Sequence, residues 1–124
     1  MTVMEAIQKT DNLKSNNFSQ EMKVEWLSRL DNMIKTLIID THEGGENVSF
    51  TGYDSNTDLH TPLLAGSPFD EMYLRWMEAQ IDYLNGEIKK YNISITMFNT
   101  EYEAFGNWYR RNHMPRNAGQ RFIF

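Results

Sequence analysis

The stretch LRWMEAQIDYLNGEIKKYNISITMFNTEYEAFGNWY, residues 74–109, decides how the rest of the chain is arranged. Its large apolar residues recur at gaps of four and three, which is the spacing of a helix that packs along its whole length. We call these positions the apolar seam: Met77, Ile81, Leu84, Ile88, Tyr91, Ile95, Phe98, Tyr102, Phe105 and Tyr109. Charged residues lie between them, so the opposite face is expected to be solvated.

Both ends of this helix carry sequence signals. Ser67 is a suitable N-cap and Pro68 suits the first helical position. Arg110 and Arg111 fall in the last turn, where positive charge is favourable, and Pro115 follows. The pattern therefore predicts a helix over about 69–112.

A single helix of that length would span about 65 Å, which is long for a small domain. The β-branched residues around 91–94 lower helix propensity there, so the alternative is two helices divided at this point. A turn rarely preserves a 4–3 register, however. We favour one helix, bent at Gly86 or Asn92.

The N-terminal third predicts two shorter helices. Residues 2–13 are amphipathic, and Ser19 is positioned to cap a second helix that ends at Gly44-Gly45. This second helix is expected to pack antiparallel to the seam helix. The pairs expected to meet are Trp26, Leu30 and Leu37 on one side and Met77, Ile81 and Leu84 on the other.

The pattern changes between the helices and after them. Val48-Ser49-Phe50-Thr51 alternates, which predicts a short strand near 47–53 within an extended segment, 46–67. Residues 113–124 form an extended C-terminal tail. The predicted fold class is mainly α: one domain over 1–124, an antiparallel helical bundle (N-terminal helices in 1–45, long helix in 68–112).

Composition narrows the function. The chain has 124 residues, no cysteine and a formal net charge of −5, which argues against a surface built to grip nucleic acid. Lys and Arg are absent between Lys35 and Arg75, and acids are absent after Glu103. No apolar run approaches the ~20 residues that a membrane helix needs, and the first residues do not resemble a signal peptide. We therefore expect a soluble intracellular protein.

No catalytic constellation is visible in the sequence. Asp54-x-Asn56-x-Asp58 begins like a calcium loop, but Leu59 stands where the sharp turn needs Gly. His42 has no second histidine one turn away, so we interpret it as part of a solvated helix end. Phosphate-binding loops and activated nucleophiles are also not seen. We predict that the protein is not an enzyme and uses no cofactor or metal.

Several runs of sequence resemble a family of small proteins from tailed phages and prophages, the head–tail connector (head completion, adaptor) proteins. The runs are Trp26-Leu-Ser-Arg-Leu-Asp31, Ile39-Asp-Thr-His-Glu-Gly-Gly45, Phe69-Asp-Glu-Met-Tyr73, Trp76-Met-Glu-Ala-Gln-Ile-Asp82, Asn85-Gly-Glu87, Met97-Phe-Asn99 and His113-Met-Pro115. The resemblance covers nearly the whole chain, and its motifs are structural rather than catalytic.

The resemblance implies a mostly helical virion subunit, made in the cytoplasm of a bacterial host, that forms a ring of about twelve copies. That ring would dock on the portal protein at the capsid vertex and meet a tail-side stopper or terminator protein. DNA would pass through its centre without specific binding, and no membrane is involved. The alternative from a different class is a small helical adaptor that binds one partner through a groove.

The interface residues come from the sequence pattern alone. We expect the seam from Phe98 to Tyr109 to lack partners within the chain, and the tail to add to an edge formed by Val48–Tyr53 of a neighbour. The alternative use of the tail is binding DNA phosphates. The predicted interface comprises Val48, Phe50, Tyr53, Phe98, Tyr102, Phe105, Tyr109, Arg110, Arg111, Arg116, Arg121, Phe122 and Phe124.

Overall fold

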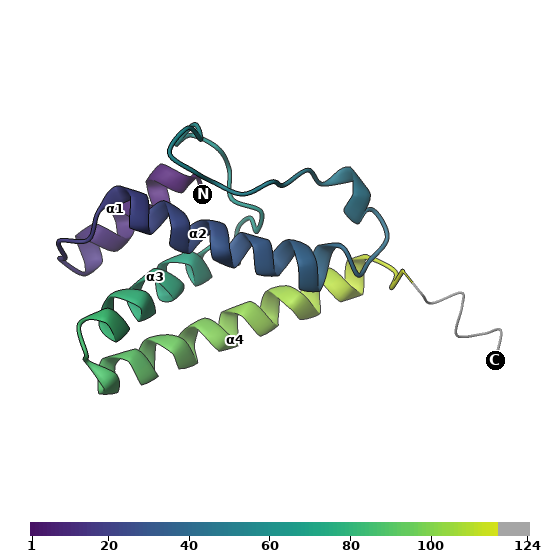
Figure 1. Ribbon diagram of the computed structural model, residues 1–124. Coiled ribbons are helices and arrows are strands. Elements are labelled where there is room, and N and C mark those ends of the chain that lie inside the picture. The colour runs from purple at the N-terminus through teal and green to yellow at the C-terminus, as the bar shows by residue number, and fades with distance from the viewer. Residues whose placement is uncertain (117–124) are drawn as a thin grey trace.

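A computed structural model describes residues 1–116, and four α-helices build this part of the chain. They are α1 (Val3–Leu13), α2 (Gln20–Ile34), α3 (Glu71–Leu84) and α4 (Ile88–Asn112). Successive helices run in alternating directions, and α4 forms the lower edge of the bundle in Figure 1. The prediction of a mainly helical chain is confirmed.

The first two helices begin where the sequence predicts. The hydroxyl of Thr2 accepts a hydrogen bond from the Glu5 amide at 3.2 Å, and the Glu5 carboxylate accepts one from the Thr2 amide at 3.1 Å. This reciprocal pair is a capping box. Ser19 caps α2 by accepting a hydrogen bond from the Met22 amide at 3.2 Å. Each of these helix starts depends on hydrogen bonds between residues three positions apart. For that reason the starts can be predicted from the sequence.

α2 ends earlier than the sequence suggests. The α-helix ends at Ile34, and the chain continues as a wider π-helical turn, η1 (Lys35–Ile39). Gly44 then takes a φ of +87°, a left-handed conformation that glycine adopts readily, and leads into the 3₁₀ turn η2 (Gly45–Asn47).

The prediction of one helix over 69–112 is wrong. The structure breaks it at 85–87, six residues before the alternative division near 91–94, and α4 folds back along α3. The start also differs, because α3 begins at Glu71 after Asp70 and not at Ser67-Pro68. The break lets α3 and α4 bury apolar faces against each other, whereas an extended helix would leave much of both in water.

The turn between α3 and α4 depends on Gly86, which has a φ of +73°. The Gly86 amide donates to the Tyr83 carbonyl at 3.1 Å, and the Glu87 amide donates to the Asp82 carbonyl at 2.9 Å. Carbonyls at the end of α3 are thus paired by the turn itself. A positive φ is unfavourable for residues with a Cβ, so this glycine determines where the helix ends.

The core is centred on α3, which packs against each of the other three α-helices. Trp26 and Leu30 of α2 are buried, as are Met77 and Ile81 of α3, as predicted. Two predicted core residues are instead exposed: Leu37 at 58% and Leu84 at 48%. Leu84 is the last residue of α3, beside the turn, and that position places it at the rim of the bundle.

The predicted strand near 47–53 is also wrong. In the described residues the only β pairing is two isolated bridges, Thr2 with Pro62 and His42 with Pro115. The backbone of this segment is held by a side chain, because the Tyr53 amide donates to Oγ of Ser28 at 3.0 Å. Alternating sequence without a neighbouring strand does not make a sheet.

A buried carboxylate fastens this loop to the bundle. Asp31 of α2 is fully buried and accepts hydrogen bonds from the hydroxyls of Tyr53 and Tyr73 at 2.5 and 2.6 Å. It also accepts one from the Leu64 amide at 3.1 Å. Burial raises the pKa of Asp31, against the lowering effect of these three hydrogen bonds. The pKa of each tyrosine is raised by burial and by the carboxylate.

A second buried carboxylate, Asp82, joins α1, α3 and α4. Lys14 donates to its Oδ1 at 2.5 Å, and the Ser94 hydroxyl donates to its Oδ2 at 3.0 Å. Both Asp82 and Ser94 are buried. This contact fixes how α4 lies against α3 near their turn.

Candidate functional site

An apolar stripe runs along the surface of α4, and we call it the α4 stripe: Ile93, Met97, Ala104 and Trp108. Ile93 is 63% exposed, Met97 42% and Trp108 39%. These positions follow each other at gaps of four, seven and four, so they share one side of the helix. Thr100 fills the remaining position. α4 therefore has two apolar faces, one in the core and one in water.

Apart from Ile88 in its first turn, which is 56% exposed, the rest of the exposed surface of α4 is polar. Asn92, Thr96, Asn99, Glu103 and Asn107 recur at gaps of four and three, and all are exposed. The α4 stripe is thus bounded and is not part of a generally apolar surface. Bounded apolar surface of this kind marks interaction sites on soluble proteins.

Charged side chains border the stripe on the side facing α3. Glu101 lies one turn from Met97 and from Ala104, and it is close to Arg75, Glu71 and Glu78. Arg75 pairs with Glu78 at 2.8 Å and Glu71 at 3.7 Å.

Glu101 is the carboxylate of this group that does not pair with Arg75 in the described residues. Its Oε2 is buried and has no hydrogen-bond partner within residues 1–116, and burial raises the pKa of its carboxyl. Three carboxylates therefore share one guanidinium beside the α4 stripe.

The first part of the C-terminal segment packs back onto the chain. The Glu43 amide donates to the Met114 carbonyl at 2.8 Å, and the Arg116 amide donates to the Thr41 carbonyl at 3.0 Å. The Arg116 guanidinium pairs with Glu46 at 2.8 Å. This arrangement fixes residues 113–116 against the end of α2 and the turn that follows it.

Aromatic stacking supports the same contact. His113 stacks face to face on Tyr109, with ring centroids 3.8 Å apart, and His42 meets the same tyrosine edge-on at 5.5 Å. Nδ1 of His42 is 2.7 Å from the Ile38 carbonyl oxygen. The interpretation of His42 as a solvated helix end is wrong, because its side chain is buried under the C-terminal segment.

The predicted interface residues fall into three groups. Phe98, Phe105 and Tyr109 are buried in the core, so the expectation that this end of the seam lacks partners within the chain is wrong. Tyr53 is buried as well, while Val48, Phe50 and Tyr102 are partly buried and pack against the core. The exposed residues are Arg110, Arg111 and Arg116, and Arg121, Phe122 and Phe124 lie outside the described residues.

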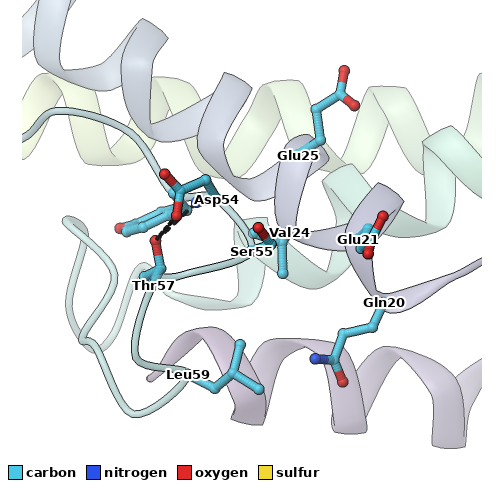
Figure 2. A pocket seen from close by; sticks show the side chains of 9 residues that line it. Gln20, Glu21, Val24, Glu25, Asp54, Ser55, Thr57 and Leu59 are labelled. Carbon is cyan, nitrogen blue, oxygen red and sulfur yellow. Dashed lines mark hydrogen bonds between the residues drawn. The ribbon is translucent and has the colours of Figure 1, made fainter.

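A shallow hollow of about 590 Å³ lies between the start of α2 and the loop after Tyr53 (Figure 2). Its carboxylates are Glu21, Glu25 and Asp54. The Asp54 carboxylate is hydrogen-bonded within its own loop, where its Oδ1 accepts a hydrogen bond from the Asn56 amide at 2.8 Å. The segment that begins like a calcium loop is therefore a set of Asx turns.

Features of two other classes of protein are not found in residues 1–116. No helix in this part of the chain is both long and apolar enough to cross a membrane. No three His, Asp or Glu side chains within residues 1–116 are grouped so that they could hold a metal ion.

The sequence contained a signal for the α4 stripe that the seam obscured. Ile93, Met97, Thr100, Ala104 and Trp108 follow a second helical period beside the first. Two of them are small, so the stripe attracts less attention than the aromatic seam. Asp31, by contrast, carries no local signal, because its partners come from residues 53, 64 and 73.

Comparison of the chain with protein-family models, with curated proteins and with solved structures found no match.

Proposed function

We propose that this chain is a structural subunit of a phage head–tail connector. In this proposal copies of the chain form a ring, of about twelve subunits by the sequence resemblance, that docks on the portal protein. A stopper or terminator protein binds on the tail side, and DNA passes through the centre. The finished particle is the virion, and no catalytic step is involved.

The observation that supports assembly most directly is the exposed α4 stripe. Its three large residues are exposed along one helix face, although the same helix buries Phe98 and Phe105 on another. Soluble monomers rarely leave a contiguous apolar surface open. A subunit that meets identical neighbours has a use for such a face, since it is buried in the assembly.

The acidic balance of the chain fits a DNA channel. A wall with many lysines and arginines would make phosphate contacts and slow the passage of DNA. A formal net charge of −5 favours sliding over binding. The arginines at the C-terminal end are better suited to docking on protein, and we propose that Phe122 and Phe124 supply affinity while the arginines set orientation.

The test is electron microscopy of the purified protein, alone and mixed with its portal protein, combined with light scattering. Closed rings, or a ring added to the portal, support the proposal. A protein that stays monomeric or dimeric in both samples contradicts it. That result would favour the alternative, a helical adaptor that uses the α4 stripe to bind a single partner.

A further inference from the structure

We propose that the α4 stripe of one subunit binds the C-terminal segment Arg121-Phe122-Ile123-Phe124 of a second copy of the chain. This inference rests on the proposed ring and specifies the contact between its neighbours. The acceptor expected from the sequence, an edge at Val48–Tyr53, is not formed as a strand, and Tyr53 is buried against Asp31.

The α4 stripe and the end of the chain are both apolar. The stripe from Ile93 to Trp108 runs for about 22 Å along α4 at about 1.5 Å per residue. Three consecutive large apolar residues end the chain. Extended, the four residues of this segment span at most about 14 Å, so they would cover part of the stripe and remove that part from water.

The charges beside the stripe also favour this contact. Glu101 lies between the stripe and α3, and its Oε2 has no hydrogen-bond partner in the described residues. Glu71 and Glu78 share Arg75, which leaves the group with excess negative charge. Arg121 directly precedes Phe122, so a docked segment would place a guanidinium beside the stripe. A guanidinium donates several hydrogen bonds in a planar fork that suits a carboxylate.

The length of chain after Arg116 favours another copy as the source of the docked segment. Arg116 is fixed at the end of α4 by Thr41 and Glu46. From there, residues 117–122 span at most about 21 Å when fully extended. Ile93 lies about 28 Å from Asn112 along the axis of α4. The chain's own Phe122 therefore cannot reach Ile93, at the far end of its own stripe.

A neighbour's tail has no such limit. The contact it makes joins two different surfaces of the same chain, the α4 stripe and the C-terminal segment. Contacts of this head-to-tail type close into rings when the rotation between subunits permits it. The inference thus supplies the kind of interface that the proposed function needs.

The test uses the absence of cysteine from the chain. One full-length variant carries Met97→Cys and another carries Phe122→Cys, and the two are mixed under mild oxidation. We expect a disulfide-linked pair of chains on a non-reducing gel. The matched control is Asn99→Cys, which is also exposed but lies on the opposite side of α4. It should cross-link to Phe122→Cys at least ten times more slowly.

Charge is tested in the same assay. Adding Glu101→Gln to the Met97→Cys chain should slow cross-linking several-fold, and adding Glu103→Gln on the polar face should not. Because Glu101 is partly buried, a thermal melt first establishes that the variant is folded. Equal rates for the two glutamine variants overturn the electrostatic argument.

Other outcomes separate this inference from the proposed function. Rings without a link between positions 97 and 122 overturn the inference and leave the ring proposal standing. A link in solutions that never form rings, alone or with portal, supports the inference and contradicts the ring. Equal cross-linking at 97 and 99, or a link confined to a single chain carrying both cysteines, overturns the inference.

Discussion

The Tyr73 hydroxyl of α3 lies 2.6 Å from Oδ1 of Asp31 in α2. The same phenol oxygen accepts a hydrogen bond from the Ala65 amide at 2.8 Å, so one side chain connects two helices and the loop that leads into α3. Both Tyr73 and Asp31 are fully buried. A carboxylate in this position needs each of its partners, because unpaired buried charge is strongly unfavourable.

Tyr73→Phe is expected to lower the free energy of unfolding by about 1.5–3 kcal/mol, the usual contribution of a hydrogen bond to a charged group. Urea denaturation followed by circular dichroism measures it. Tyr83→Phe is the matched control, since Tyr83 is 60% exposed and its change should stay within about 0.5 kcal/mol. Equal effects of the two substitutions would show that the Asp31 contact does not stabilise the fold.

Asp31 should also give stability a distinctive dependence on pH. Its pKa is raised by burial in the folded protein above its ordinary value, so the folded state retains this proton to higher pH than the unfolded state. Stability from this group is therefore fully present below the unfolded pKa and is lost as pH rises through the folded pKa.

The measurement is the unfolding free energy of the native chain minus that of Asp31→Asn, across a pH series from about 3 upward. Other carboxylates cancel in this difference. We expect the difference to fall as pH rises and then to level off. A difference that grows with pH would mean that the hydrogen bonds outweigh burial and lower the pKa of Asp31.

Ser94→Ala tests the contact that fixes α4 against α3. The substitution removes the hydroxyl donor to Asp82 but improves helix propensity, so we expect a net loss of about 1–2 kcal/mol. Thr96→Ala two residues along is the control, because its hydroxyl is exposed and donates to the Asn92 carbonyl of its own helix at 2.7 Å. Thermal melts of both variants at one pH provide the comparison. If the Ser94 variant is as stable as the Thr96 variant, the hydrogen bond between Ser94 and Asp82 does not stabilise the fold.

Gly86→Ala tests the turn that divides the predicted long helix. A Cβ here would meet nothing within 4 Å, so its effect comes from the positive φ alone and should be about 1–2 kcal/mol of destabilisation. Gly66→Ala meets equally open space without a positive φ and should be neutral or slightly stabilising. Chemical denaturation measures the free energy of unfolding of the two variants. Equal values would show that the positive φ of Gly86 does not account for the effect of the substitution.

The sequence was most informative where structure depends on neighbouring residues. The starts of α1 and α2 follow from Thr2 and Ser19, whose hydroxyls cap backbone groups within three residues. The break at Gly86 was harder to recognise, because the apolar spacing continues through the turn without a change of register. One continuous helix and two helices joined by a turn both satisfy that spacing. The packing of α4 on α3 is what selects the two helices.

Other features depend on contacts between distant segments. Asp31 is held by residues 22 to 42 positions away in sequence, and His42 is covered by a segment beginning about seventy residues later. The pattern of one helix cannot show these partners. The acidic group around Arg75 also joins distant segments. Glu101 lies near Arg75 because α4 folds back along α3.

The tight turn at Gly86 also bears on how the chain reaches its native state. The most extensive helix–helix contact joins α3 and α4, which are separated by only three residues, so little chain entropy opposes their meeting. Proteins dominated by such local contacts fold fast. We expect the α3–α4 hairpin to form early and to offer a template on which α1 and α2 then dock. Substitutions within the hairpin would accordingly slow folding, whereas those in α1 would mainly speed unfolding.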